Sequence, residues 1–520
     1  MNTQYPFSRD VCPSFLAKAE ALKPVLRRTE VRPVCVVEAY EDPAAFQRCA
    51  VRDAGISVAD ALAKDYGSGD SFTLDFGDHQ VGFLTFRYTD FDRVPDSPLR
   101  LRLTFAELPL ELLRKQESVG GTLCSNWFQE EIVNIDFIPG ETSLPRRYAF
   151  RYLKVEVLGR NQGYRVKFTD FVCTAVSSAD PANVPPLPVG TPDDLLAIDR
   201  VALRTLHDCM QDVFEDGPKR DRRLWLGDLR LQALANHATF RNTALVRRCL
   251  YLFAGEPRPD GWASCAIFTW PRVRADGWHL VDYSLFFLSV LHDEWRQNGD
   301  LAFTRELWPF AFHQIELMAV RMDAKGGKVD TEESFFFVDW CPGLDKQAAA
   351  QGIVIYVFRQ ALALAQALGD EAAAAFVAPR IEAYAEVARG FYDAGIGLFR
   401  SGPEGQVTQA SQAWLVLARV FDDERNRDIL RRMLARTPDL AMRTPYMVHH
   451  FVDALLSAGL RNEAMEAMRA YWGGMAGRCK ADTFFEAYNP ADDFESPYND
   501  AVLNSACHAW SCTPALLLRK

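Results

Sequence analysis

One stretch of the chain, residues 215–228, says most about fold and function. It reads Glu215-Asp216-Gly217-Pro218-Lys219-Arg220-Asp221-Arg222-Arg223-Leu224-Trp225-Leu226-Gly227-Asp228. The Asp-Gly-Pro start predicts a turn that feeds a helix, because Asp or Gly caps a helix and proline is tolerated in the first turn. If that helix continues through Asp228, then Asp221, Trp225 and Asp228 share one face. Two acids beside an indole are typical of a sugar site, since carboxylates bind hydroxyls and move protons while the indole covers a pyranose.

A second interpretation of this stretch is structural. A charge-rich helix start is more often a solvated surface than a binding site. Trp225 argues against that interpretation, because an indole seldom lies among charges without packing against something. Composition alone therefore leaves both interpretations open.

The stretch resembles the catalytic motif of bacterial α-L-rhamnosidases of glycoside hydrolase family 78, the inverting enzymes built on an (α/α)6 barrel. In that family an Asp-Cys-Pro or Asp-Gly-Pro turn leads to an Arg, an acidic residue and then Trp-x-Gly-Asp. The matching residues here are Asp216, Arg220, Asp221, Trp225 and Asp228. The resemblance implies that Asp221 is the general acid and that Arg220, Asp216, Trp225 and Asp228 surround the sugar.

A second motif lies near the end of the chain. Thr483-Phe484-Phe485-Glu486 is followed by a polar stretch, 487–504, and then by Ser505-Ala506-Cys507-His508-Ala509-Trp510. It resembles the Thr-x-x-Glu and Ser-x-x-His-x-Trp segments of the same rhamnosidases. The resemblance implies that Glu486 is the general base and that His508 lies at the sugar. Both motifs occur in the family's order with a barrel's length of chain between them.

The first part of the chain predicts β structure. Ser71–Gly77, Val81–Tyr88 and Leu99–Phe105 alternate apolar and polar residues with the period of half-buried strands. Residues 159–163 form a hairpin signal between Tyr152–Leu158 and the run 164–168. Many short antiparallel strands imply a β-sandwich. The family resemblance implies a jelly roll, with a similar Asp-Phe-Gly at 75–77 and Val-Gly at 81–82.

The pattern changes after a proline-rich linker at 177–190. Helical periodicity recurs from residue 191 onward. The predicted segments are Leu229–Cys249, Tyr283–Gln297, Ala302–Met322, Gln351–Leu368, Glu371–Ala394, Gln409–Val420, Arg425–Thr437, Thr444–Ala458 and Arg461–Tyr471. Roughly 325 residues at about 27 per helix and loop supply twelve helices. The predicted fold is therefore multidomain α and β: a jelly-roll-like β-sandwich with its linker at 1–190, then an (α/α)6 barrel at 191–520.

Three further candidate segments lie between the two motifs, at residues 258–262, 276–283 and 337–340. The resemblance carries Asp282, Asp339 and Trp340 over as residues that line the rhamnose pocket. Trp262 and Trp278 stand beside glycine turns, as carbohydrate-binding loops often require. Each of these two could equally be core, with its N–H bonded to backbone.

Composition limits the classes of binding partner and the cellular compartment that are expected. The net charge of −11 disfavours nucleic acid and anionic membranes, which attract clustered Lys and Arg. The N-terminus lacks a signal-peptide pattern and no long apolar run predicts a membrane span, so a cytoplasmic protein is expected. The twelve scattered cysteines contain no Cys-x-x-Cys pair, and reduced thiols are the simple explanation. No cofactor or metal is expected, and adjacent His449 and His450 point different ways on a helix.

These features predict an enzyme that removes terminal α-L-rhamnose from small glycosides by an inverting acid/base mechanism, with no metal. The sequence does not specify an oligomeric state, and a homodimer is one expectation. The alternatives are another inverting (α/α)6 glycosidase or a catalytically silent sugar-binding protein. The chain has Asp221 where most family members have Glu. Either the barrel holds the glycosidic oxygen closer or the acid role belongs elsewhere, and both possibilities stay open.

Overall fold

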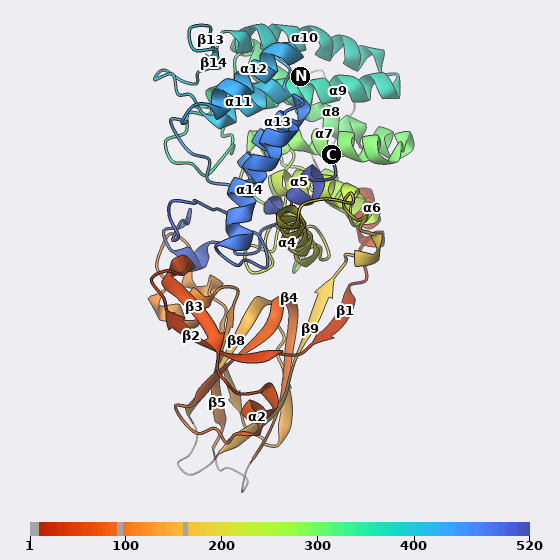
Figure 1. The fold of residues 1–520 in the computed structure, drawn as a ribbon. Helices are drawn as coiled ribbons and strands as arrows, with labels where there is room; N and C mark the ends of the chain where they lie inside the picture. The colour runs from red at the N-terminus through yellow and green to blue at the C-terminus, as the bar shows by residue number, and fades with distance from the viewer. Residues whose placement is uncertain (1–9, 91–96, 160–164) are drawn as a thin grey trace.

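The computed structural model describes residues 10–90, 97–159 and 165–520. A β domain carries a helical barrel at one end of its strands (Figure 1). Its elements are α1 (Pro13–Ala21), β1 (Arg27–Val31), β2 (Cys35–Glu41), β3 (Cys49–Asp53), α2 (Val58–Ala63), β4 (Ser71–Asp90), β5 (Leu99–Ala106), α3 (Pro109–Leu112), β6 (Glu130–Ile135), β7 (Gly140–Ser143), β8 (Tyr148–Gly159) and β9 (Val166–Ser177).

The β domain is organised by one long strand. β4 unites the two predicted strands at 71–77 and 81–88, with a register shift between Asp75 and Gln80. Its first part pairs with β8 and its second part with β9, all antiparallel, in the order β1-β9-β4-β8-β5-β6. The curled sheet encloses a core of Leu, Phe and Val side chains, which gives the sandwich that the alternating sequence predicted.

The sequence predicted a hairpin between residues 152 and 168, but the strands found there pair with a third strand. Residues 160–164 lie outside the described part of the chain, and in that part β8 and β9 do not pair with each other. Both pair with β4, β8 through residues 148–156 and β9 through residues 166–175. Proximity in sequence suggested a hairpin, but the bend in β4 lets one strand serve both layers.

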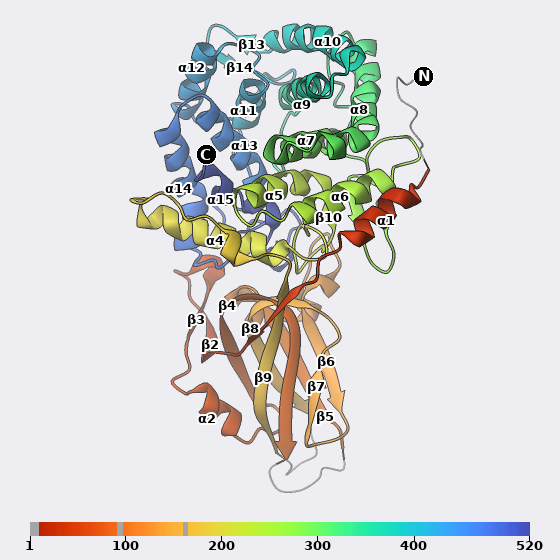
Figure 2. The ribbon, with the colours of Figure 1, turned by 90° about the vertical axis from the view of Figure 1, so that its right-hand side faces the viewer.

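The helical domain has alternating outer and inner helices (Figure 2). The outer helices are α4 (Asp193–Cys209), α6 (Thr243–Gly255), α8 (Leu301–Ala324), α10 (Glu371–Arg389), α12 (Asp423–Leu434) and α14 (Arg461–Gly477). The inner ones are α5 (Leu226–Ala238), α7 (Val281–Asn298), α9 (Gln347–Leu368), α11 (Gln409–Leu417) and α13 (Pro445–Ser457), each packed on the next. The short turn η6 (Ala509–Ser511) and helix α15 (Pro514–Leu517) contact both α5 and α13, and so close the ring. This is an (α/α)6 barrel.

Three features join or decorate the barrel. Short strands β10 (Leu224–Trp225), β11 (Ala266–Phe268) and β12 (Arg274–Ala275) form one small sheet, and β13 (Tyr392–Asp393) and β14 (Leu398–Phe399) form another. Helix α1 packs on α6, where the backbone N–H of Cys12 donates to the carbonyl of Gly255 at 2.9 Å. Residues before β1 thus lie against the barrel. The predicted division at residue 190 stays a prediction.

Helix α9 is long and apolar enough to cross a membrane, contrary to the expectation that no such run exists. However, 78% of its apolar window is buried inside the protein. Its position as an inner helix explains that composition, because a helix covered on all sides is apolar all round.

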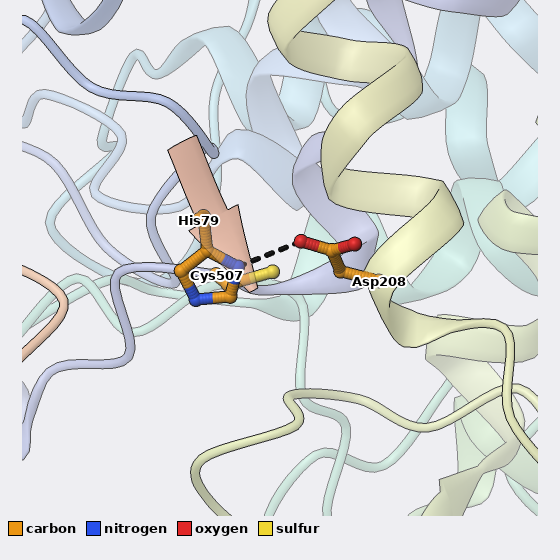
Figure 3. A group of neighbouring side chains, drawn as sticks. All are labelled: His79, Asp208 and Cys507. Carbon is orange, nitrogen blue, oxygen red and sulfur yellow. Dashed lines mark hydrogen bonds and ion pairs between the residues drawn. The ribbon is translucent and has the colours of Figure 1, made fainter. Parts of the chain in front are cut away.

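Buried charges join the two domains. His79 of β4 lies between Asp208, at the end of α4, and Glu107, just after β5, with ring nitrogen to carboxylate distances of 2.7 and 3.1 Å. Figure 3 shows His79 and Asp208 together with Cys507 from the C-terminal segment. Burial opposes a charged imidazole, but Cys507 and the two carboxylates together hold the pKa of His79 well above its ordinary value. The cluster is thus an ionic contact between sandwich and barrel.

Candidate active site

The turn that carries Asp221 is not helical, so the helix predicted from residue 216 is wrong. Arg222 has a φ of +62°, which interrupts any helix, and α5 begins only at Leu226. The buried carboxylate of Asp216 accepts the backbone N–H groups of Asp221 and Arg223 at 3.2 and 3.0 Å. This side chain replaces the carbonyl acceptors of a helix and fixes the loop instead.

The three predicted residues of one helix face therefore come from three different elements. Asp221 stands in the turn, Trp225 ends β10, and Asp228 lies in the first turn of α5. Gly227 between them is required by packing, because a Cβ there would overlap the ring of Tyr283 on α7. The loop and the close approach of α5 to α7 bring these residues to one place without a continuous helix.

Arg220 connects the two predicted catalytic acids. Its Nη2 donates a hydrogen bond to Oε2 of Glu486, and its Nη1 lies 3.5 Å from Oδ1 of Asp221. Its Nε donates to the carbonyl of Leu503 at 3.2 Å, and its guanidinium lies 4.2 Å from the centre of the Tyr498 ring. One guanidinium group thus lies between the two carboxyl groups.

Glu486 is almost fully buried and strongly hydrogen-bonded. Tyr498 donates its hydroxyl to Oε1, and the backbone N–H of Ser505 donates to Oε2 at 3.3 Å. Burial alone would raise the pKa of Glu486, but Arg220, together with His508 and Tyr498, holds it below the ordinary value. Glu486 is therefore a carboxylate at neutral pH, the form that a general base needs.

Asp228 and His508 form a neutral pair beside these charges. Burial, with the charges of Asp216 and Glu486, raises the pKa of Asp228 well above its ordinary value. Burial lowers the pKa of His508 to about 4. Oδ1 of Asp228 lies 3.7 Å from Nδ1 of His508, and neither atom makes a hydrogen bond within the described residues. Among the described residues, both atoms therefore keep unused hydrogen-bonding capacity.

The aspartates near Asp221 retain protons. Burial and the neighbouring charge of Asp221 raise the pKa of Asp216 to about 8. Asp221 is the most exposed of the three aspartates, with 17% of its side chain accessible against 3% for Asp228. It is also faced by two guanidinium groups, Arg220 at 3.5 Å and Arg223 at 3.8 Å. Asp221 is thus the member of this group that a substrate reaches most easily.

Asp282 and Asp339 bind backbone. Asp282, on the first turn of α7, accepts the N–H groups of Phe337 and Val338 at 2.9 and 3.3 Å. Asp339 accepts the N–H groups of Arg443 and Thr444 at 2.8 and 3.0 Å, and the Thr444 hydroxyl at 2.6 Å. Burial raises the pKa of each aspartate to about 6. The two carboxylates anchor the loop that presents Trp340.

The tryptophans divide into exposed and buried ones. Trp340 is 41% exposed, and its ring centre lies 6.3 Å from that of Tyr498, so it forms part of the wall of the site. Trp225 is half-buried and packs edge-to-face on Tyr283. Trp262 is buried against Arg321 and His279 as a core residue, whereas Trp278 is 70% exposed.

The described residues contain one His/Asp/Cys group with closely spaced ligand atoms, namely His79, Asp208 and Cys507, within 4.8 Å of one another (Figure 3). Its polar atoms already serve other partners, because Asp208 also accepts from Arg204 at 3.0 Å and His79 binds two carboxylates. The geometry fits an ion-paired cluster better than a metal site. The sequence also contains one pair of adjacent histidines, His449 and His450. In the structure, Nδ1 of His450 lies 2.8 Å from the backbone carbonyl of Tyr446.

Sequence reasoning missed Tyr498 and the buried carboxylates of the β domain that reach this region. Tyr498 lies in the polar stretch after Glu486, where no periodic pattern marks one residue over another. Its role follows only from its contacts with Glu486, Arg220 and Trp340. An aromatic hydroxyl inside a polar loop near an acidic motif is the one signal that could have identified it.

A cluster of carboxyl groups on an (α/α)6 barrel, with one ionised acid, a second and more exposed acid and an exposed indole nearby, has the groups that a glycoside hydrolase needs. Residues 33–175 match the glycosyl hydrolase family 78 alpha-rhamnosidase N-terminal domain. Residues 191–520 match the bacterial alpha-L-rhamnosidase 6 hairpin glycosidase domain. The chain therefore belongs to the family 78 α-L-rhamnosidases.

Solved structures agree with that membership. A rhamnosidase from Klebsiella oxytoca with rhamnose bound is 45% identical, with a TM-score of 0.94, over 98% of this chain and 99% of that chain. A family 78 rhamnosidase from Bacillus sp. GL1 is 23% identical, with a TM-score of 0.73, over 86% of this chain and 46% of the other, and shows the fold alone. No curated protein sequence matches the chain. The protein is an α-L-rhamnose-releasing glycoside hydrolase, as the sequence predicted.

Proposed function

We propose that this α-L-rhamnosidase removes terminal rhamnose from small rhamnosides with inversion, with Asp221 as general acid and Glu486 as general base. The observation that carries the proposal is the position of Arg220, whose two Nη atoms face the two carboxyl groups. An intervening guanidinium group is compatible with the separation of about 6.5–9.5 Å that an inverting enzyme needs to admit water. Two carboxyl groups in direct contact would leave no room for that water molecule.

Hydrolysis with inversion needs one carboxyl group that donates a proton and one that accepts a proton from water. Asp221 gives its proton to the glycosidic oxygen as the bond to the anomeric carbon breaks. A water molecule attacks that carbon from the opposite face and loses its proton to Glu486. The lowered pKa of Glu486 supports the base role, because this carboxyl group is ionised before substrate binds.

Two guanidinium groups face the proposed acid: Arg220 lies 3.5 Å and Arg223 lies 3.8 Å from the carboxyl oxygens of Asp221. Burial and neighbouring charges raise the pKa of Asp216 and of Asp228, so both are neutral carboxyl groups beside Asp221. Among the three aspartates, the greater exposure of Asp221 favours it as the residue that delivers the proton.

The sugar and the compartment are part of the same proposal. The Klebsiella oxytoca rhamnosidase holds rhamnose and matches nearly all of this chain, which supports L-rhamnose as the sugar bound here. Asp228 and His508 would bind its hydroxyls, and Trp340 would cover its ring. All twelve cysteines are free thiols, which supports a reducing compartment such as the cytoplasm.

The test compares leaving groups in two variants. Asp221→Asn and Glu486→Gln should each lose about 10² to 10⁴ in turnover of an unactivated rhamnoside. An aryl rhamnoside with an activated leaving group should partly restore Asp221→Asn and leave Glu486→Gln inactive, because only the first lacks the acid. Asp212→Asn is the matched control, since Asp212 is 42% exposed and pairs with Lys23. Full turnover of the unactivated substrate by either variant would end the assignment.

A further inference from the structure

One buried side chain of the β domain, Glu107, binds the segment of the barrel that supports the catalytic base. Glu107 follows β5 in the sandwich and is 5% exposed. Its Oε1 binds His79 at 3.1 Å, and its Oε2 accepts the backbone N–H of Ala506 at 3.1 Å. Ala506 belongs to the barrel segment 502–508, so a carboxylate of one domain holds the backbone of the other.

The segment 502–508 supports the base at several points. The carbonyl of Leu503 accepts from Nε of Arg220, and the backbone N–H of Ser505 donates to Glu486. The next residue, Ala506, is the one bound by Glu107, and His508 follows two residues later. A shift of Ala506 would therefore disturb Arg220, which is held by Leu503, and the hydrogen bond from Ser505. Both of these keep Glu486 ionised.

A second connection passes through Lys219, the residue before Arg220. Its ammonium group is 2% exposed and lies 3.5 Å from Glu107 and 3.1 Å from Glu111, both in the β domain. It also donates to the carbonyl of Val502 at 3.1 Å. Buried ion pairs of this kind are costly to break, since a lone charge remains without water. Glu107 thus holds Lys219, the residue next to Arg220, and Ala506, the residue after the Ser505 that binds Glu486.

We infer that Glu107 is a positioning residue of the rhamnosidase reaction, through which the β domain fixes the contact between Arg220 and Glu486. The inference rests on the proposed roles of those two residues. Glu107 lies behind the site and touches no reacting atom. It acts through the backbone of Ala506 and through Lys219.

The surroundings of Glu107 offer an unusual test. A cavity of about 430 Å³ between the domains is lined by Glu107, His79 and Ala506, and by the side chains of Tyr40 and Tyr152. It is open to solvent and far larger than an acetate ion. Acetate can therefore enter the space left when Glu107 is shortened to alanine, and its carboxylate can accept from Ala506 and pair with Lys219.

The expected result is specific to positioning. Glu107→Ala should lose about 10- to 100-fold in kcat on an aryl rhamnoside, because displacement of a catalytic group by about 1 Å has effects of this size. The acidic limb of its pH profile should move to higher pH, because Glu486 keeps its burial and its neighbours His508 and Tyr498 but loses a well-placed Arg220. Added acetate should restore part of kcat.

Glu130→Ala is the matched control. Glu130 is also a buried carboxylate of the β domain, but it pairs with Arg102 at 3.3 Å inside that domain. It should retain the wild-type acidic limb and show no response to acetate. An acidic limb and kcat in Glu107→Ala equal to those in Glu130→Ala would overturn the inference.

If Glu107→Ala does not fold, Glu107→Gln and Glu130→Gln provide the same comparison. The glutamine can still accept from Ala506 but cannot pair with Lys219, so a smaller shift of the acidic limb is expected. Coincident profiles for these two variants would also overturn the inference. Activity of the wild-type enzyme and its loss in Glu486→Gln test the proposed function separately, so the two failures cannot be confused.

Discussion

Replacing Tyr498 by phenylalanine isolates one contribution to the base. The hydroxyl of Tyr498 donates to Oε1 of Glu486, and its ring stacks on Arg220. Phenylalanine keeps the ring and the stacking while removing the donor. The carboxylate form of Glu486 should therefore lose stabilisation, and the pKa of Glu486 should rise.

The size of that rise can be worked from the contacts. A hydrogen bond to a charged group contributes about 1.5–3 kcal/mol, and one pKa unit corresponds to about 1.4 kcal/mol. Arg220 and the Ser505 N–H still stabilise the carboxylate in the variant. We therefore expect the pKa to rise by about one unit. The base acts only when ionised, so the loss of activity on acidification should begin about one pH unit higher.

The assay is the pH dependence of kcat/KM on an aryl α-L-rhamnoside. Tyr498→Phe should keep a plateau at higher pH within about tenfold of wild type, with its acidic limb displaced upward. Tyr488→Phe is the control. Tyr488 is a buried phenol two residues from Glu486, but its pKa is set by burial and by Cys479 and Arg478. An unchanged acidic limb in Tyr498→Phe, or an equal displacement in Tyr488→Phe, would refute the reasoning.

Two further predictions concern other residues of the site. If the pocket has adapted to the shorter acid, Asp221→Glu should lower kcat/KM on an unactivated rhamnoside by up to about 10²-fold, because the extra methylene misplaces the proton donor; a clear gain over wild type would show that Asp221 is a weakened acid. Asp339→Asn should lower the free energy of unfolding in urea by about 1–3 kcal/mol, because its amide N–H₂ would face backbone donors of residues 443–444. Unchanged stability with a raised KM would instead assign Asp339 to the sugar.

The sequence was sufficient to predict the fold because each domain repeats a local pattern. Alternating residues in 71–105 predicted the strands, and apolar stripes after residue 191 predicted most barrel helices within a few residues of their ends. The helix predicted at Leu229–Cys249 is wrong, because the chain breaks after Ala238 and divides this segment between α5 and α6. The joining of two predicted strands into β4 could not be foreseen, since the bend at 75–80 depends on partners from β8 and β9.

The candidate site was predictable only in part. The two motifs supplied Asp216, Asp221, Asp228, Glu486 and His508, which the structure brings together, although their roles stay predictions. The helix expected across residues 216–228 failed because the carboxylate of Asp216 satisfies the backbone donors of the turn. The contact of Glu107 with Ala506 joins residues 399 positions apart, a separation at which no local pattern operates.

The stereochemistry of the first product tests the central claim most directly. If Glu486 activates a water molecule and does not attack the anomeric carbon, β-L-rhamnose should appear first when an α-L-rhamnoside is hydrolysed. Proton NMR of the fresh hydrolysate distinguishes the two anomers before mutarotation. Initial accumulation of β-L-rhamnose is the predicted result, and initial accumulation of the α-anomer would show retention and contradict the proposed roles of Asp221 and Glu486.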